Sequence, residues 1–218
     1  RPSRESHTFQ TIRQMGLECI GAVDAAAQSE VVGLAWQSLT ALGVAAVLEI
    51  SHMGFVTGLL DALAIEPTAR GRLLEYLRGK NGHELRRAAE KAGLTPTAAD
   101  SLCGLLALNG TPAEVLPKAE ACCLCEAQRS ALTELRQLLD TLPAQGCELR
   151  LDLSMADEMD YYNGLVFTGY AAGIPCAVLK GGRYDYLMQR FTPGANAIGF
   201  AMYLDELERL AAPLPPVQ

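Results

Sequence analysis

Apolar and polar residues along the chain switch repeatedly between strand-like and helical spacing. Residues 9–21 carry polar side chains at intervals and end at a glycine, which favours a strand. Residues 24–43 repeat their apolar side chains every three or four positions, so they predict a helix with Gly43 as its C-cap. A second strand over residues 44–51 and a short helix over residues 54–65 follow. The first third of the chain therefore combines sheet and helix.

The middle of the chain consists of short amphipathic segments with a helical repeat. Over residues 67–110, glycine and asparagine end one helix before the next begins. These breaks are Asn81-Gly82, Gly93 and Asn109-Gly110. A longer helix over residues 126–142 leads out of this region. We expect a helical insertion at residues 65–120 between two parts of one sheet.

The last third is rich in strands separated by short connections. The expected strands cover residues 147–154, 164–173 and 175–182, and residues 196–210 begin as a strand and continue as a helix. Short connections favour antiparallel pairing. The pattern predicts an α+β protein in which helices flank an antiparallel sheet. Residues 1–64 and 121–218 would build this sheet, on either side of the insertion.

The composition is that of an ordinary globular chain with an acidic surplus. The 218 residues are 50% hydrophobic and 20% charged, and the formal net charge is −7. This charge argues against a broad phosphate-binding face, because non-specific nucleic-acid affinity comes largely from cations that neutralise phosphates. No apolar run approaches the roughly 20 residues that span a bilayer, and no signal-type segment opens the chain. The chain begins without a methionine, so we expect that its own start is missing.

The seven cysteines are scattered, and their odd number does not suggest a disulfide framework. A reducing cytoplasm is the expected location. Cys122, Cys123 and Cys125 form the one cluster, but neither a second pair nor a histidine stands nearby at ligand spacing. The carboxylates within residues 152–160 are spaced too irregularly for a cation-binding loop. We expect no metal site and no cofactor.

Two polar residues stand on the strand expected at residues 9–21. Gln14 and Glu18 are four positions apart, so their side chains point to the same face. A carboxylate accepts a hydrogen bond from an N–H group, and an amide both donates and accepts, so the pair suits a small ligand with an amine or an imidazole. The alternative is that Glu18 simply lies on a solvated face of the sheet. The spacing is compatible with both interpretations.

Two tyrosines and a glycine-containing turn add to this candidate pocket. Tyr161 and Tyr162 precede the expected strand at residues 164–173, and Gly182 and Tyr184 belong to the turn GGRY. Glycine lets a ligand approach the backbone closely, and phenols supply further hydrogen bonds. The sequence contains no nucleophile elbow, phosphate-binding loop or zinc-protease motif, and its three histidines stand far apart. Binding is therefore better supported than catalysis.

Several of these stretches resemble the second half of the histidyl-tRNA synthetase catalytic domain. MDYYNGLVF, GGRYDYL and AIGFAMYLDEL are similar to that family in order and spacing, and IRQMGLECIG resembles the strand that ends its second motif. The resemblance covers nearly the whole chain and implies the class II synthetase fold. It also implies that Gln14 holds the α-amino group of histidine, and that Glu18 and Tyr162 read the imidazole. Tyr184 would be a further pocket tyrosine.

Three positions depart from the synthetase pattern. Asp157 stands where the family has an arginine that binds carboxylate and phosphate, Tyr203 where it has a glycine beside ATP, and Glu206 where it has a second arginine. An acid repels the anions that a guanidinium group would clamp. We therefore expect that adenylation is lost. Which residue would contact the carboxylate of a bound histidine is left open.

A synthetase-like chain without activation chemistry resembles one further family, the regulatory subunits of ATP phosphoribosyltransferase. Residues 72–94 and 148–170 are closer to that family than to true synthetases. The resemblance implies a non-catalytic subunit for the first step of histidine biosynthesis. Its partner would be the short-form catalytic subunit, with self-association and with histidine as a candidate effector. We expect neither a membrane nor tRNA as a partner. The alternatives are a fragment of a divergent histidyl-tRNA synthetase and a stand-alone histidine-binding or scaffold protein.

Overall fold

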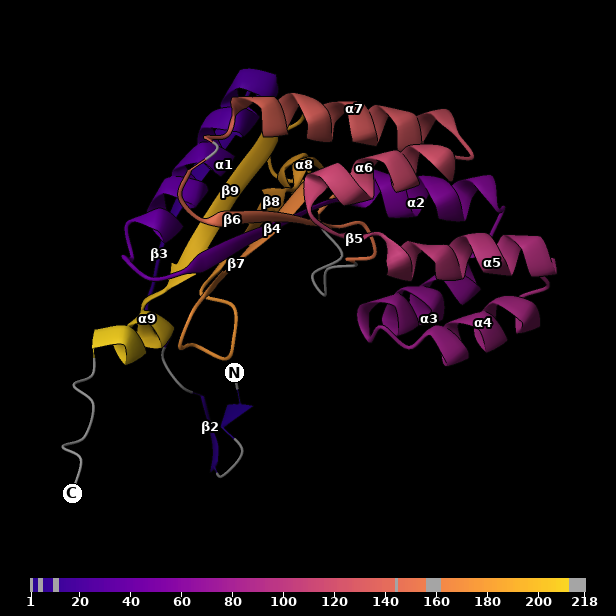
Figure 1. The fold of residues 1–218 in the computed structure, drawn as a ribbon, viewed down its shortest axis with the longest axis horizontal. Helices are drawn as coiled ribbons and strands as arrows, with labels where there is room; N and C mark the ends of the chain where they lie inside the picture. The colour runs from indigo at the N-terminus through magenta and orange to yellow at the C-terminus, as the bar shows by residue number, and fades with distance from the viewer. Residues whose placement is uncertain (1, 4–5, 10–11, 144, 156–161, 212–218) are drawn as a thin grey trace.

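The centre of the fold is one large sheet. The computed structural model describes residues 2–3, 6–9, 12–143, 145–155 and 162–211. Within them, seven strands form a sheet in the order β3-β9-β8-β7-β4-β6-β5 (Figure 1). The strands are β3 (Gln14–Gly21), β4 (Ala46–His52), β5 (Asn109–Gly110), β6 (Glu148–Asp152), β7 (Leu165–Ala171), β8 (Leu179–Arg183) and β9 (Asn196–Tyr203). Before them, β1 (Pro2–Ser3) and β2 (Ser6–Phe9) pair with each other.

Neighbouring strands of the large sheet run antiparallel, except β4 and β6, which are parallel. The exception follows from the connection, since the mainly helical residues 53–147 join these two strands and a parallel pair needs such a crossover. The predicted α+β class with a synthetase-like sheet is confirmed, with this one pair running the other way. The strand predicted from residue 9 is divided, because β2 ends at Phe9 and β3 begins at Gln14.

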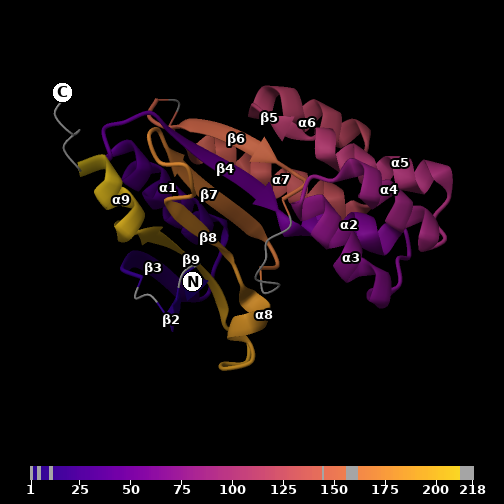
Figure 2. The same cartoon turned by 90° about the horizontal axis from the view of Figure 1, so that it is seen from below.

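One layer of helices covers one face of the sheet. α1 (Ala25–Thr40) and α7 (Glu126–Thr141) lie behind the strands in Figure 2, and α2 (Met53–Ala62) packs along α7. Val32, Ala35 and Leu39 of α1 are completely buried. The helix ends at Thr40 and not at the predicted Gly43, which follows the C-cap with a φ of 69°.

A second group of helices, the helical segment of residues 67–121, extends away from the sheet (Figure 1). It contains α3 (Pro67–Arg78), α4 (Gly82–Lys91), α5 (Pro96–Gly104), a 3-10 turn (Leu105–Ala107) and α6 (Pro112–Ala121). The breaks predicted at Asn81-Gly82 and Gly93 separate α3, α4 and α5, and the Asn81 side chain caps α4. Leu73, Leu85 and Leu102 belong to the same buried apolar cluster as the sheet core. The domain boundaries at 65 and 120 therefore stay a prediction.

Two short helices stand on either side of β9. α8 (Asp185–Met188) precedes it and had no clear signal in the sequence, whereas α9 (Leu204–Ala211) follows it as predicted. The backbone N–H and Nε of Arg13 both donate to the Asp205 carboxylate of α9, each over 2.9 Å. This contact ties the residue before β3 to the end of β9. No described helix is both long enough and apolar enough to cross a membrane.

The contact between α1 and the sheet provides a matched pair of glycine tests. A Cβ on Gly33 of α1 would meet nothing within 4 Å, so Gly33→Ala should stabilise the fold by about 0.5–1 kcal/mol. A Cβ on Gly169 of β7 would come within 2.8 Å of Leu39 Cδ1 and 2.9 Å of Leu179 Cβ. Gly169→Ala should therefore destabilise by about 1–3 kcal/mol, through overpacking. Urea unfolding measures both effects. A Gly169→Ala variant with an unchanged free energy of unfolding would contradict this packing of α1.

Candidate ligand-binding site

The sheet face opposite α1 and α7, called the open face below, carries the polar residues singled out in the sequence. Strand register places Glu18 of β3, Gly199 of β9 and Gly182 of β8 side by side in one row across this face. Gln14 points to the same face beside Tyr203, four residues from Glu18, or about 13 Å along the strand. The two polar residues of β3 therefore share a face but lie at different ends of it.

Glu18 is oriented by a tyrosine. The Tyr184 hydroxyl donates a hydrogen bond to Glu18 Oε2. The rings of Tyr184 and Tyr162 meet edge to face, with centroids 6.5 Å apart. The Glu18 side chain is nevertheless exposed, as the alternative of a solvated position on the sheet had predicted. A carboxylate that is both fixed and accessible can accept an N–H group from a ligand.

Two glycines make room for these side chains. A Cβ on Gly199 would overlap Glu18 Oε2, and a Cβ on Gly182 would lie 2.6 Å from Cδ1 of Tyr162. The close approach expected at Gly182 is thus made by a tyrosine ring of the chain itself. Gly199 was missed, although a glycine inside an apolar strand often marks such a close approach.

A buried carboxylate organises the turn that carries Tyr184. Asp185 Oδ2 accepts hydrogen bonds from Arg183 Nε at 2.7 Å and Asn163 Nδ2 at 3.2 Å. Asp185 Oδ1 accepts from the Ala197 N–H at 3.1 Å, and Asn163 Oδ1 accepts from the Asp185 N–H at 2.7 Å. Charge-assisted contacts of this kind are strong. The network joins β8, β9 and the residue after Tyr162, so it holds both pocket tyrosines in register. Asp185 was also missed, because no spacing rule marks it.

The predicted residues fall into three groups. The structure brings together Glu18, Tyr162, Gly182 and Tyr184. Gln14 lies apart from them beside Tyr203, and Glu206 lies in the first turn of α9 with Oε2 3.0 Å from Arg209 Nη1. Tyr161 and Asp157 lie outside the described residues.

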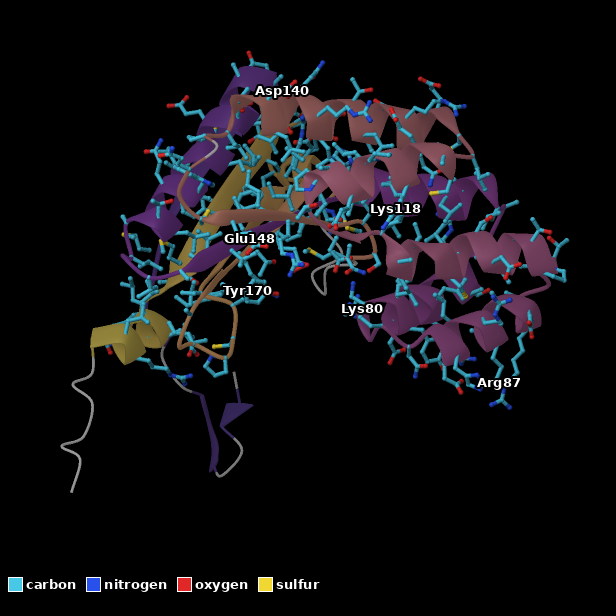
Figure 3. All side chains as sticks on the ribbon, viewed as in Figure 1. Lys80, Arg87, Lys118, Asp140, Glu148 and Tyr170 are labelled. Atoms are coloured by element: carbon cyan, nitrogen blue, oxygen red, sulfur yellow. The ribbon has the colours of Figure 1, made fainter. Side chains whose placement is uncertain are left out.

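A second polar group lies on the open face, toward the opposite edge of the sheet. Lys80, between α3 and α4, donates to the carboxylate of Asp152 and the hydroxyl of Ser154. In Figure 3 it points from the helical segment toward the sheet. Burial raises the pKa of the nearby Glu49 above its ordinary 4.5, Asp152 raises it further, and Lys80 partly offsets both effects. The sequence did not predict these contacts, since Lys80 and Asp152 are 72 positions apart.

The remaining candidate residues have structural roles. His52 caps α2 by accepting from the Gly54 N–H at Nδ1 over 3.1 Å, so Nε2 carries the proton that faces Glu134 Oε2 at 3.2 Å. This contact lowers the pKa of Glu134. The thiols of Cys122 and Cys123 both donate to the Ala119 carbonyl, and that of Cys125 to Gly58. Among the described residues, no three His, Cys, Asp or Glu side chains gather as a metal site would require.

The mostly antiparallel sheet with a layer of helices on one face is a synthetase-like core. A family model described as histidyl-tRNA synthetase matches residues 1–207. The chain belongs to the histidyl-tRNA synthetase family.

Curated relatives point to one branch of this family. An ATP phosphoribosyltransferase regulatory subunit from Geobacter sulfurreducens is 34% identical over 199 residues, which are 90% of this chain and 45% of that protein. One from Geobacter metallireducens is 34% identical over 218 residues, which are 99% of this chain and 49% of that protein. The chain thus spans about half the length of these relatives.

Solved structures agree with this placement. A structure from Bacillus halodurans, described as an ATP phosphoribosyltransferase regulatory subunit/histidyl-tRNA synthetase, has a TM-score of 0.83 at 30% identity and covers 94% of this chain and 55% of its own. A histidyl-tRNA synthetase from Nostoc sp. PCC 7120 has a TM-score of 0.76 at 18% identity, covering 92% of this chain and 49% of its own. The ATP phosphoribosyl transferase (HisG:HisZ) complex from Thermotoga maritima reaches 0.71, also at 18%, covering 93% of this chain and 69% of its own. The last two show the shared fold.

The raised pKa of Glu49 predicts a pH-dependent stability. The folded chain binds this proton more tightly than the unfolded chain, so the contribution of Glu49 to stability falls as the pH rises through and above 4.5. Glu49→Gln keeps the neutral form at every pH. We expect it to raise the melting temperature at pH 8 and to change it little near pH 4.

The control is Glu148→Gln, which removes an exposed carboxylate from the neighbouring strand β6. Thermal melts of both variants and the parent over this pH range give the comparison. Equal responses of Glu49→Gln and Glu148→Gln would contradict the assignment to Glu49.

Proposed function

We propose that the chain is the synthetase-like part of a non-catalytic regulatory subunit of ATP phosphoribosyltransferase, acting in the first step of histidine biosynthesis with the short-form catalytic subunit. The observation that carries the proposal is the 34% identity to regulatory subunits over 90% and 99% of this chain. The proposal extends to a pocket for histidine on the open face, beside Glu18. Histidine bound there would be the signal that the subunit passes to its partner.

The geometry around Glu18 supports a cationic or imidazole ligand. The carboxylate is exposed and already oriented by Tyr184, so a ligand N–H finds an acceptor that needs no rearrangement. Gly16 and Ala201 lie in the next row of the same face, so only small residues stand between Glu18 and Gln14. An amino acid could therefore lie along β3, with its side chain toward Glu18 and its α-amino group toward Gln14.

The neighbouring part of the face supports the loss of ATP chemistry. Tyr203 places a large side chain beside Gln14, where the synthetase resemblance implies a glycine. Asp205 and Glu206 add negative charge in the first turn of α9. Activation of an amino acid with ATP develops negative charge that needs cationic partners, and the arginines next to these residues, Arg13 and Arg209, already pair with Asp205 and Glu206. Their placement favours a regulatory role over adenylation.

Lys180 is our candidate for the partner of the histidine carboxylate. It lies on the open face, paired with Ala201 in the row next to that of Glu18 and Gly199. The arginine nearest to Lys180 in the sequence is Arg183, but it forms an ion pair with Asp185. No ion pair joins Lys180 to a carboxylate among the described residues, so its charge is available to a ligand.

A reconstitution tests the main proposal. The natural gene product that contains this chain should restore phosphoribosyl-ATP formation when it is mixed with the short-form catalytic subunit of the same organism, and neither component should be active alone. Steady-state assays with and without histidine measure both activity and inhibition. A mixture as inactive as its parts would refute the regulatory assignment. Histidine-dependent exchange of pyrophosphate into ATP by the chain alone would instead identify a synthetase.

Histidine and histamine together test the pocket, because histamine lacks the carboxylate. Glu18→Gln should weaken the binding of both ligands by about 1.5–3 kcal/mol, since it removes a charged acceptor from the imidazole. This corresponds to about 10- to 100-fold. Lys180→Gln should weaken the binding of histidine by a similar factor and leave the binding of histamine unchanged. Titration calorimetry on the parent and the variants measures these affinities.

The matched control is Glu30→Gln, an exposed carboxylate of α1. It should leave the binding of both ligands unchanged. Unaltered histidine affinity in Glu18→Gln would exclude the pocket, and equal losses of histidine and histamine in Lys180→Gln would exclude the carboxylate contact.

A further inference from the structure

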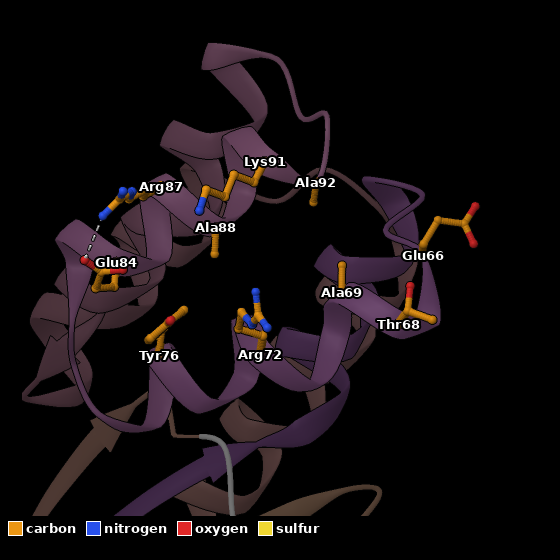
Figure 4. Close-up of a pocket in the computed structure, with 10 residues that line it drawn as sticks. All are labelled: Glu66, Thr68, Ala69, Arg72, Tyr76, Glu84, Arg87, Ala88, Lys91 and Ala92. Carbon is orange, nitrogen blue, oxygen red and sulfur yellow. Dashed lines mark ion pairs between the residues drawn. The ribbon is translucent and has the colours of Figure 1, made fainter.

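The helical segment contains a basic hollow that lies apart from the candidate pocket at Glu18. α3 and α4 enclose a cavity of about 420 Å³, a volume within the usual range of small-molecule pockets. Small side chains line both sides of the gap, Ala69 from α3 and Ala88 and Ala92 from the end of α4 (Figure 4). Arg72 rises from α3 and Lys91 from α4, so that the two cations face each other across the middle of the hollow. We call this site the α3–α4 hollow.

The two central cations have no acidic partner. No ion pair joins Arg72 or Lys91 to a carboxylate among the described residues. Neighbouring arginines are paired, since Arg70 contacts Asp61 and Arg86 lies 2.5 Å from Asp100. In a chain with a net charge of −7, two unpaired cations that converge on one cavity are an exception. Their mutual repulsion would be relieved by a bound anion.

Further groups at the rim favour an anion over a neutral ligand. Arg87 is held only loosely, with Nη1 3.8 Å from Glu84 Oε1 and an exposed side chain. Thr68, in the first turn of α3, adds a hydroxyl at one end of the hollow. Tyr76 lines the same wall as Arg72, one helical turn away, and offers a phenol to the remainder of a ligand.

The acidic residues of the hollow limit the size of the anion. Glu84 stands at one end and Glu66 at the other, on either side of the central cations (Figure 4). An extended polyanion such as a nucleic-acid strand would run over one of these carboxylates and be repelled. A compact anion placed between Arg72 and Lys91 stays clear of both carboxylates. The charge pattern therefore selects a small molecule.

We propose that the α3–α4 hollow binds a small phosphorylated compound, with its phosphate between Arg72 and Lys91 and the rest of the molecule along Tyr76. The guanidinium and ammonium groups supply charge-assisted hydrogen bonds to the phosphate oxygens. The site lies in the helical segment, away from the Glu18 pocket, and does not depend on the regulatory function.

Titration calorimetry with inorganic pyrophosphate on the 218-residue chain tests the proposal. The unmodified chain should bind pyrophosphate at low ionic strength, and Arg72→Gln/Lys91→Gln should bind it at least about tenfold more weakly, since two charged hydrogen bonds are lost. Arg72→Lys, which keeps the charge, should retain most of the affinity. A short single-stranded RNA, titrated in parallel, distinguishes a compact anion from a polyanion.

The matched control removes two cations elsewhere, by Lys118→Gln on α6 and Arg190→Gln after α8, both exposed. It should bind pyrophosphate as the parent does, and thermal melts check that every variant folds. Absence of pyrophosphate binding, or an equal loss in the control, would overturn the proposal. So would RNA that binds more tightly than pyrophosphate and depends on the same two residues.

Discussion

Three glycines where β8 pairs with β9, Gly181, Gly182 and Gly199, have no room for a Cβ, and the packing on both faces of the sheet depends on this constraint. On the helical face, a Cβ at Gly181 would lie 2.5 Å from Phe200 Cβ and 2.6 Å from Phe167 Cε2, two aromatic residues that pack with centroids 6.4 Å apart. On the open face, Gly182 and Gly199 leave the space that the pocket side chains occupy. A close-packed core does not admit an added methyl group without strain. The absence of a side chain at these three positions therefore makes room for the core and for the candidate pocket together.

The Glu18 side chain is positioned by contacts within the protein. Tyr184 fixes Glu18, and the buried Asp185 fixes the turn that carries Tyr184, so the acceptor is in place before a ligand arrives. Such preorganisation lowers the cost of binding. The first turn of α9 carries two further carboxylates, Asp205 and Glu206, and each is paired with an arginine. Glu18 is thus a carboxylate of this sheet that is both oriented and exposed.

Residue spacing and helix-ending residues predicted those features of the fold that depend on neighbours in the sequence. The period of two placed Gln14 and Glu18 on one face, and asparagine and glycine marked the ends of the helices. Such patterns could not predict the direction of a strand or a contact between residues far apart in the sequence. The parallel pair of β4 and β6 depends on a long crossover, and α8 is too short to show a helical repeat. Asp185 and Gly199 matter because of residues far away in the sequence, which no spacing rule reports.

Lys80 shows how such a long-range contact joins the helical segment to the open face. An exposed ion pair is worth at most about 1 kcal/mol. The Asp152 side chain, however, is only 9% exposed, and Glu49 already competes with it for positive charge. Ser154 donates only to Oδ1 of this carboxylate, so without Lys80 its Oδ2 would lose the lysine that donates to it. A buried acceptor that is left unsatisfied costs about 1–3 kcal/mol. Lys80 also occupies the left-handed bend between α3 and α4, with a φ of 51°. The bend between α3 and α4 therefore also carries the cation that pairs with Asp152 of β6, and Lys80 links the helical segment to the open face of the sheet.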